Sequence, residues 1–218
     1  MTGVRGNLPA GMVPKGVVLV VDDDASVRKG LSSLFRSAGL TVEVFASAAE
    51  MERSSRSEAA NCLVLDVRLP TLNGLEFQEH LARSDSQIPI IFITGHADVP
   101  MTIQAMKGGA IDFFTKPVDG RAILGAVSAA IDRDRKRRER ENAGEALRAS
   151  FETLTPRERE VMALVTAGLM NKQVAAEMGL REITVRIHRG NVMRKMKARS
   201  LPDLVRMADS LRLRRPAT

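Results

Sequence analysis

The chain has 218 residues, a length that favours two domains, and its charge is uneven: residues 1–128 have a net charge of −2 and residues 129–218 one of +9. The basic second part indicates a polyanionic partner, although a solvated cationic surface would give the same composition. One cysteine excludes an internal disulfide, and no apolar run is long enough to span a bilayer, so we expect a cytoplasmic protein without membrane contacts.

The chain begins with residues 1–15, which carry Gly and Pro where a signal peptide needs an apolar core, and which predict a flexible tail. Four apolar segments then end abruptly on polar side chains. Val17–Val21 runs into Asp22, Asp23 and Asp24, Cys62–Leu65 ends at Asp66, and the segments 88–93 and 111–114 end at Thr94 and at Thr115-Lys116. Short apolar runs of this kind predict buried parallel strands.

Helical patterns separate these segments and complete five strand-and-helix units. The first helix begins at the capping residue Asp24 and runs to about Ala38; residues 41–45 then alternate as a half-buried strand before a helix capped by Ser47. Further helices are predicted over 72–81, around 101–106 and from about 120. Strand alternating with helix predicts an α/β fold with a doubly wound, five-stranded parallel sheet.

Parallel strands place their carboxyl ends along one edge of a sheet, so the polar residues after these strands meet in one crevice. Asp22, Asp23 and Asp66 supply the hard oxygen ligands that suit Mg²⁺. Asp66 is then a candidate nucleophile towards a phosphoryl group, with Thr94 as its hydrogen-bond donor and Lys116 as its counter-charge. Taken singly, the acids also fit as helix caps and the other two residues as a strand end and a turn residue. Four such strand ends in one chain favour the site.

The segment from Asp132 to Asn142 has no apolar side chain. A helix there would be solvated on every face, because it would have no apolar stripe to bury. We therefore predict a charged helical linker over residues 131–150, either a semi-rigid spacer or an exposed extension of the preceding helix.

Residues 151–218 are helical in pattern. Thr155-Pro-Arg-Glu158 predicts a capping box, Asn171 is the expected cap of the next helix, and Gly179 separates it from a long helix over 182–197. Two helices joined by a glycine turn predict a small all-α helix-turn-helix domain. The last long helix carries an apolar face formed by Val185, Val192, Met193 and Met196. Its opposite, outer face presents Arg186, Ile187, Gly190, Arg194 and Lys197. A cationic outer face is positioned to enter the major groove.

The strand ends together resemble a known family. Asp22-Asp23, Asp66 with Arg68, Thr94-Gly95-His96 and Lys116-Pro117 resemble the receiver domain of two-component response regulators, over about residues 16–130. The resemblance implies a flavodoxin-like fold in which Asp66 accepts a phosphoryl group from a phosphohistidine of a sensor histidine kinase.

The receiver resemblance also implies ligands and a switch. Mg²⁺ is expected to bind Asp23, Asp66 and the backbone carbonyl of Arg68 directly, with Asp22 acting through water, and the bond before Pro117 is expected to be cis. In that family the residues at Thr94 and Phe113 shift together on phosphorylation, whereas an ordinary core position explains Phe113 equally well. The helix around 101–106, the strand 111–114 and the helix from 120 form the family's usual dimer face.

The C-terminal motifs resemble a second family. Thr155-Pro-Arg-Glu-Arg-Glu-Val161, Gly168-Leu-Met-Asn-Lys172 and Thr184-Val-Arg-Ile-His188 resemble the LuxR-type DNA-binding domain over about residues 150–212. With a receiver ahead of it, the chain resembles the NarL/FixJ class, and its residues 94–101 resemble FixJ and the styrene regulator StyR in particular. The resemblance implies a homodimer when phosphorylated that binds double-stranded promoter DNA.

The same resemblance implies which residues touch DNA. Base contacts are expected at Arg186, Ile187 and Gly190, although Gly190 has no side chain with which to read a base. The candidates for phosphate contacts are Lys172, Thr184, His188, Arg194, Lys195 and Lys197.

Two other functions fit parts of the sequence. A haloacid-dehalogenase-type phosphatase also attacks with a strand-end aspartate, but that family expects a second acid two residues later, where this chain has Arg68. A binding protein could instead use the receiver as a docking module without phosphorylation. Phosphoryl transfer to Asp66 is the hypothesis that accounts for all four strand ends, and it implies a transcription regulator that is not an enzyme.

Overall fold

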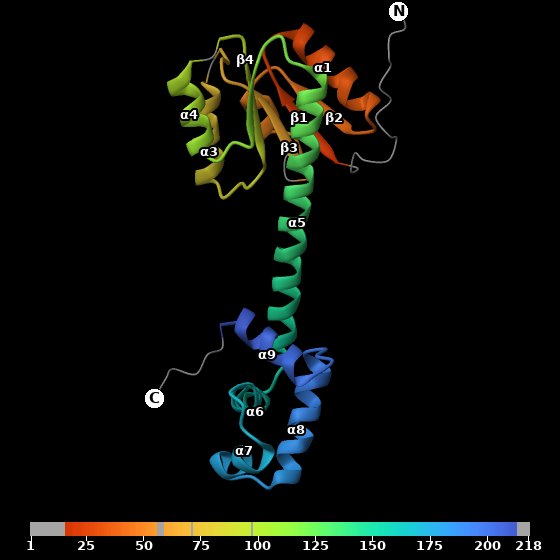
Figure 1. Ribbon diagram of the computed structural model, residues 1–218, viewed down its shortest axis with the longest axis vertical. Coiled ribbons are helices and arrows are strands. Elements are labelled where there is room, and N and C mark those ends of the chain that lie inside the picture. Colours follow the sequence, from red (N-terminus) through yellow and green to blue (C-terminus); the bar gives the residue numbers. More distant parts are fainter. Residues whose placement is uncertain (1–15, 56–58, 71, 97, 213–218) are drawn as a thin grey trace, which may run out of the picture. The chain divides into compact units, whose positions relative to one another are not determined.

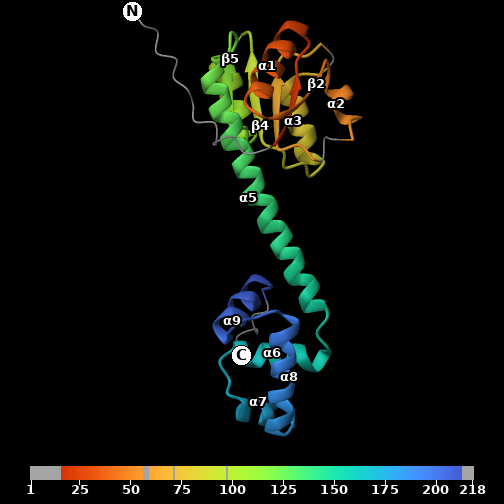
Figure 2. The same ribbon diagram turned by 90° about the vertical axis from the view of Figure 1, so that its right-hand side faces the viewer.

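The structure is a computed structural model that describes residues 16–55, 59–70, 72–96 and 98–212 (Figures 1 and 2). The chain divides into two compact units between Arg137 and Arg138, a point inside the longest helix. The tail predicted at residues 1–15 lies outside the described residues.

The N-terminal unit is built on a five-stranded sheet in which every neighbouring pair of strands is parallel, in the order β2-β1-β3-β4-β5. The strands are β1 (Val17–Val21), β2 (Thr41–Phe45), β3 (Cys62–Asp66), β4 (Ile90–Thr94) and β5 (Asp112–Thr115). The helices are α1 (Ala25–Ser37), α2 (Ala48–Glu52), α3 (Gly74–Arg83), α4 (Val99–Lys107) and α5 (Gly120–Glu152). The predicted doubly wound fold is confirmed.

Alternate strand residues face opposite sides of the sheet and build two cores. Leu19, Leu63 and Phe92 belong to the core under α2, α3 and α4, whereas Val18 and Val64 belong to the core under α1 and α5 (Figure 1). This division follows from the two-residue period of a strand, since both faces of a central parallel strand are buried.

Most of the predicted helix caps are confirmed. Asp24 caps α1, with its side chain accepting from the Ser26 N–H at 2.7 Å, and Ser47 caps α2. Gly39 follows α1 with φ +85°, a left-handed conformation that favours glycine.

The prediction that residues 132–142 are solvated on every face is wrong at one position. Asp134 is fully buried: it accepts a hydrogen bond of 2.9 Å from the Asn61 amide and pairs with Arg137. Asn61 in turn accepts from the Val17 N–H at 2.9 Å. A polar contact with the start of β1 therefore anchors α5 beyond its apolar turns, and the helix continues unbroken to Glu152.

The C-terminal unit has the predicted helix-turn-helix. It contains α6 (Pro156–Thr166), α7 (Asn171–Met178), α8 (Glu182–Lys195) and α9 (Leu201–Ser210) around one apolar core. The Thr155–Glu158 capping box opens α6, as predicted, and Gly179 ends α7 with φ +64°. Asn171 is not the cap of α7: Met170 holds that position, while the Asn171 side chain accepts from Arg189 at 3.0 Å.

Candidate functional site

Three carboxylates meet at the carboxyl edge of the sheet. The register pairs Val21 of β1 with Leu65 of β3, so that the next residues, Asp22 and Asp66, lie side by side across neighbouring strands. Asp22 is fully buried and Asp66 is 4% exposed, whereas Asp23 is exposed. One oxygen from each of these three carboxylates lies within 4.8 Å of the others.

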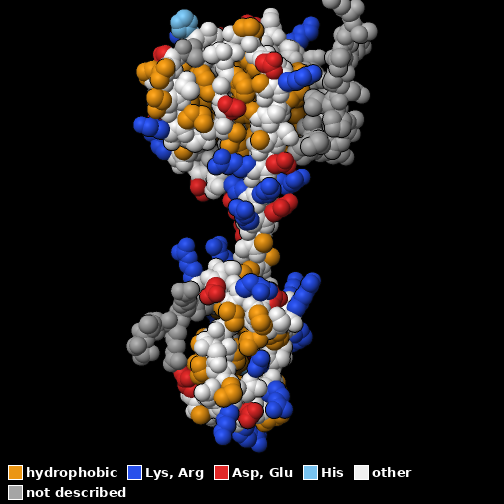
Figure 3. Space-filling view, in the orientation of Figure 1, with side chains coloured by type: hydrophobic (Ala, Val, Ile, Leu, Met, Phe, Trp, Pro, Cys, Tyr) orange, Lys and Arg blue, Asp and Glu red, His pale blue; other side chains and the backbone are white. Residues whose placement is uncertain are grey.

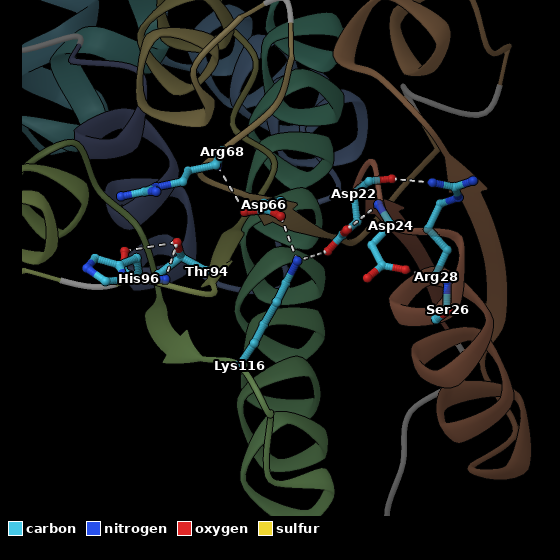
Figure 4. A network of polar contacts seen from close by, with 9 residues as sticks. All are labelled: Asp22, Asp24, Ser26, Arg28, Asp66, Arg68, Thr94, His96 and Lys116. Carbon is cyan, nitrogen blue, oxygen red and sulfur yellow. Dashed lines mark hydrogen bonds and ion pairs between the residues drawn. The ribbon is translucent and has the colours of Figure 1, made fainter.

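Lys116 points between the two buried carboxylates (Figure 4). Its Nζ lies 2.6 Å from Asp22 Oδ2 and 2.6 Å from Asp66 Oδ2. The contact with Asp66 is a hydrogen bond, but the contact with Asp22 is an ion pair outside hydrogen-bonding geometry, so that Asp22 Oδ2 is buried without a hydrogen-bond donor. The Lys116–Pro117 bond is cis, as the receiver resemblance implied.

Burial and the neighbouring charges have opposite effects on the pKa values of Asp22 and Lys116. Burial raises the pKa of Asp22 above its ordinary value, although the ion pair with Lys116 and the hydrogen bond from the Asp24 N–H act in the opposite direction. Burial alone would lower the pKa of Lys116, but its contacts with Asp22 and Asp66 raise it. Lys116 therefore stays charged at neutral pH and offsets part of the negative charge of the site.

The donor set fits Mg²⁺. It consists of carboxylate oxygens, of which Asp22 Oδ2 lacks a hydrogen-bond donor, and such hard oxygens suit a small divalent cation that keeps several waters. The loop after β3 is fixed by the Arg68 N–H, which donates to Asp66 Oδ1 at 2.9 Å. A close approach between this loop and α3 requires Gly74, since a Cβ there would collide with the Asp66 carbonyl oxygen.

Thr94 and Phe113 lie on the neighbouring strands. Thr94 is fully buried, and its hydroxyl donates to the His96 carbonyl at 3.1 Å and accepts from the His96 N–H at 3.3 Å (Figure 4). The hydroxyl is thus bonded within its own loop. Phe113 is half-buried and packs against Phe92, with ring centroids 6.3 Å apart.

The second candidate surface is the outer face of α8. Val185, Val192 and Met196 are buried on its inner face. The outer residues Arg186, Ile187, Gly190 and Arg194 are all exposed, as predicted. Lys197 is exposed too, but the helix ends at Lys195, two residues earlier than predicted, and Lys197 follows it with φ +56°. Figure 3 shows Lys and Arg side chains along the margin of this unit where α8 runs. Lys172 on α7 is also exposed, and Thr184 and His188 are half-buried.

Lys195 differs from the other cations of α8. Its Nζ donates to Glu158 Oε2 at 2.6 Å and to the Thr153 carbonyl at 3.1 Å, and its side chain is 25% exposed. Burial alone would raise the pKa of Glu158, but the bonds from Lys195 and the Thr155 N–H lower it below its ordinary value. The Lys195 ammonium is therefore already engaged inside the unit, where it joins α8 to the start of α6.

Comparison with known families identifies both domains. The family model of the response regulator receiver domain matches residues 18–128, and that of the luxR family of bacterial regulatory proteins matches residues 152–208. The chain belongs to the two-component response regulators with a LuxR-type DNA-binding domain. The acidic crevice lies in its receiver domain and the cationic outer face of α8 in its DNA-binding domain.

Several full-length relatives resemble this response regulator. Nodulation protein W of Bradyrhizobium diazoefficiens is 59% identical over 90% of this chain and 87% of its own length. Transcriptional regulatory protein FixJ of Azorhizobium caulinodans is 42% identical, over 88% and 90%. The solved structure of response regulator StyR matches with a TM-score of 0.83 at 46% identity and covers 90% of this chain and 99% of that one.

Sequence reasoning missed two residues at these surfaces. Arg28 of α1 donates to the Asp22 carbonyl at 2.6 Å, and Ile183 of α8 is 53% exposed on the same outer face as Ile187. The spacing of four residues between the two isoleucines is a signal that could have found Ile183.

Among the helices of the described ranges, none combines the length and the apolar composition needed to cross a membrane.

Proposed function

We propose that Asp66 accepts a phosphoryl group from a phosphohistidine of a sensor histidine kinase, and that this controls promoter binding. The observation that carries the proposal is the convergence of Asp22, Asp23 and Asp66 at the edge of the sheet, where Lys116 contacts both Asp22 and Asp66. A carboxylate oxygen of Asp66 forms a bond to phosphorus while the phosphorus–nitrogen bond breaks, and the imidazole keeps the electron pair and takes up a proton.

The other residues of the crevice have distinct roles in this transfer. Lys116 offsets the negative charge of the phosphoryl group, and Thr94 donates its hydroxyl to a phosphoryl oxygen after leaving the His96 carbonyl. Asp23, Asp66 and the Arg68 carbonyl would hold Mg²⁺ directly and Asp22 would act through water; the ion would reduce the repulsion between the carboxylate and the phosphoryl donor. Phe113 follows Thr94 as the partner residue of the switch.

The output of the transfer is a homodimer that binds double-stranded promoter DNA. Arg186 and Ile187 contact bases at the exposed outer face of α8, where Gly190 lets the backbone come close to the DNA. The phosphate contacts fall to Lys172, Thr184, His188, Arg194 and Lys197. We leave Lys195 out of this set, because Glu158 holds its ammonium. A cytoplasmic location follows, since phosphohistidine donor and promoter are both there.

The test compares two aspartates of the receiver domain. The full chain is incubated with acetyl phosphate and Mg²⁺, and its mass, its sedimentation and its affinity for duplexes selected from a random pool are measured. The wild type and Asp24→Asn should gain one phosphoryl group and bind more tightly, because asparagine caps a helix as well as aspartate. Asp66→Asn should do neither. Equal affinities with and without acetyl phosphate in a phosphorylated wild type would refute the control mechanism.

A further inference from the structure

We propose that Ile183 acts with Ile187 as an apolar reader of DNA sequence that recognises the methyl groups of thymine. This inference rests on the proposed DNA binding of α8 and names a residue and a ligand feature for it. We call Ile183 and Ile187 the isoleucine pair. Their side chains are 53% and 60% exposed, and both are among the most exposed large hydrophobic residues of the DNA-binding domain.

The isoleucine pair has no role in the core of the domain. The two residues are four positions apart, which places them on one face of the helix with their Cβ atoms roughly 6 Å from one another. The buried residues Val185, Val192 and Met196 lie on the opposite face. Isoleucine is also a poorer helix former than leucine or lysine, so neither burial nor helix propensity explains two of them at exposed positions.

The charges around the isoleucine pair favour DNA as the occupant over an apolar protein partner. Arg186 and Arg194 are exposed on the same side of α8, and Lys197 is exposed just beyond the end of the helix. The acid that precedes the isoleucine pair, Glu182, lies 3.7 Å from Arg186, which offsets its charge. A small apolar centre with cations around it matches a major groove, where phosphates border the base edges.

The chemistry of the major groove then selects the base. The only apolar group that a base pair presents there is the C5-methyl group of thymine, and an aliphatic side chain has no hydrogen bond to offer the other edges. Ile183 lies in the first turn of α8, and recognition helices contact bases through their N-terminal residues. With base pairs about 3.4 Å apart, the pair spans roughly two steps.

Because Gly190 has no side chain, base recognition by the outer face of α8 depends more on the isoleucine pair. Gly190 lies on the same outer face, and a Cβ placed there would meet no atom within 4 Å. The backbone can thus approach the groove without a third side chain between it and the bases. The specificity of this face therefore depends on the isoleucine pair and Arg186.

The experiment uses the full chain treated with acetyl phosphate and Mg²⁺. Duplexes are selected from a random pool with wild type, and each thymine of the selected site is replaced by uracil, which removes only the methyl group. We expect about fourfold weaker binding at two thymines within two or three base pairs of each other, the loss for one buried methyl group. Ile183→Ala should lose one of these effects and Ile187→Ala the other. Val44→Ala, an exposed valine of the receiver sheet, should keep both.

The outcomes separate the two proposals. If the wild type selects a specific site but binds its thymine and uracil forms equally, the isoleucine pair does not read methyl groups, while the proposed DNA binding stands. Loss of both uracil effects in Val44→Ala would also overturn the inference. If the wild type selects no sequence at all, both the proposed function and this inference fail.

Discussion

Replacing Asp134 with alanine removes the centre of the buried polar contact that anchors α5. The carboxylate is fully buried and bonds the Asn61 amide at 2.9 Å and the Arg137 guanidinium. Asn61 also accepts from the Val17 N–H, so the contact reaches the first residue of β1. The variant should therefore destabilise the sheet as well as the helix.

The size of the effect follows from what the substitution leaves behind. Removing one member of a buried ion pair costs about 3–5 kcal/mol, because the partner charge stays desolvated. The Arg137 side chain is 27% exposed and can turn partly to water, so we expect about 3 kcal/mol, the lower end of that range. The same helix supplies a control: Asp132 and Arg135 form an ion pair with the same three-residue spacing but are 43% and 54% exposed. Asp132→Ala should cost below about 1 kcal/mol.

Hydrogen exchange of the full chain measures this difference, because peptides from β1 and β3 report on the N-terminal unit alone. We expect protection of these strands to fall by about a hundredfold in Asp134→Ala, since each 1.4 kcal/mol is about a factor of ten. In Asp132→Ala protection should fall by about fivefold or less. Equal losses in the two variants would show that burial of Asp134 does not contribute to the anchor, and the reasoning would be refuted.

Four further predictions follow from the two domains. Gly74→Ala should weaken Mg²⁺ binding in calorimetry, because its Cβ displaces the Asp66 carbonyl and the loop that follows; unchanged affinity would contradict this close approach. Glu158→Gln should destabilise the DNA-binding domain by about 1–2 kcal/mol at pH 7 in thermal melts, since Lys195 loses its carboxylate. Because the folded pKa of Glu158 is lowered, its contribution is complete above the ordinary value of 4.5 and is lost as pH falls through the folded value, so the two melting curves should converge in acid. Gly190→Ala should stabilise α8 by about 0.5–1 kcal/mol, because the added methyl group meets no atom within 4 Å; a lower melting temperature would contradict this. The logarithm of the affinity for the selected duplex should fall linearly with the logarithm of the salt concentration, with a slope of about −0.9 for each phosphate contact; a slope of zero would exclude these contacts.

Much of the fold could be predicted because its signals are local. The apolar runs that end on Asp22, Asp66 and Thr94 define strands of a parallel sheet, and parallel strands necessarily bring their carboxyl ends to one edge. The cap at Asp24 and the left-handed turn at Gly39 depend on neighbouring residues only. Where the deciding interaction spans a few residues, the sequence pattern and the structure mostly agree; the cap of α7 is an exception, since Met170 holds the position predicted for Asn171.

The interactions that the sequence did not indicate involve partners far away in the chain. Asp134 is predicted to be solvated because the residues around it are not apolar, yet it is buried and accepts a hydrogen bond from Asn61, 73 residues earlier. The phosphate contact of Lys195 stays a prediction, but the ammonium already pairs with Glu158, 37 residues earlier. A charged side chain gives the same sequence pattern whether it is exposed to solvent or paired inside the protein.

The amino-acid sequence by itself determined the parallel sheet, its acidic edge and the outer face of the last long helix, since all three follow from periodicity and from the chemistry of side chains at strand ends. Only the tertiary structure decided which charged groups are available. It placed Lys116 between Asp22 and Asp66, engaged Lys195 and left Ile183 exposed. The physical reason is that the role of an ionic side chain depends on its desolvation and on the nearest opposite charge, and both are set by packing between distant segments.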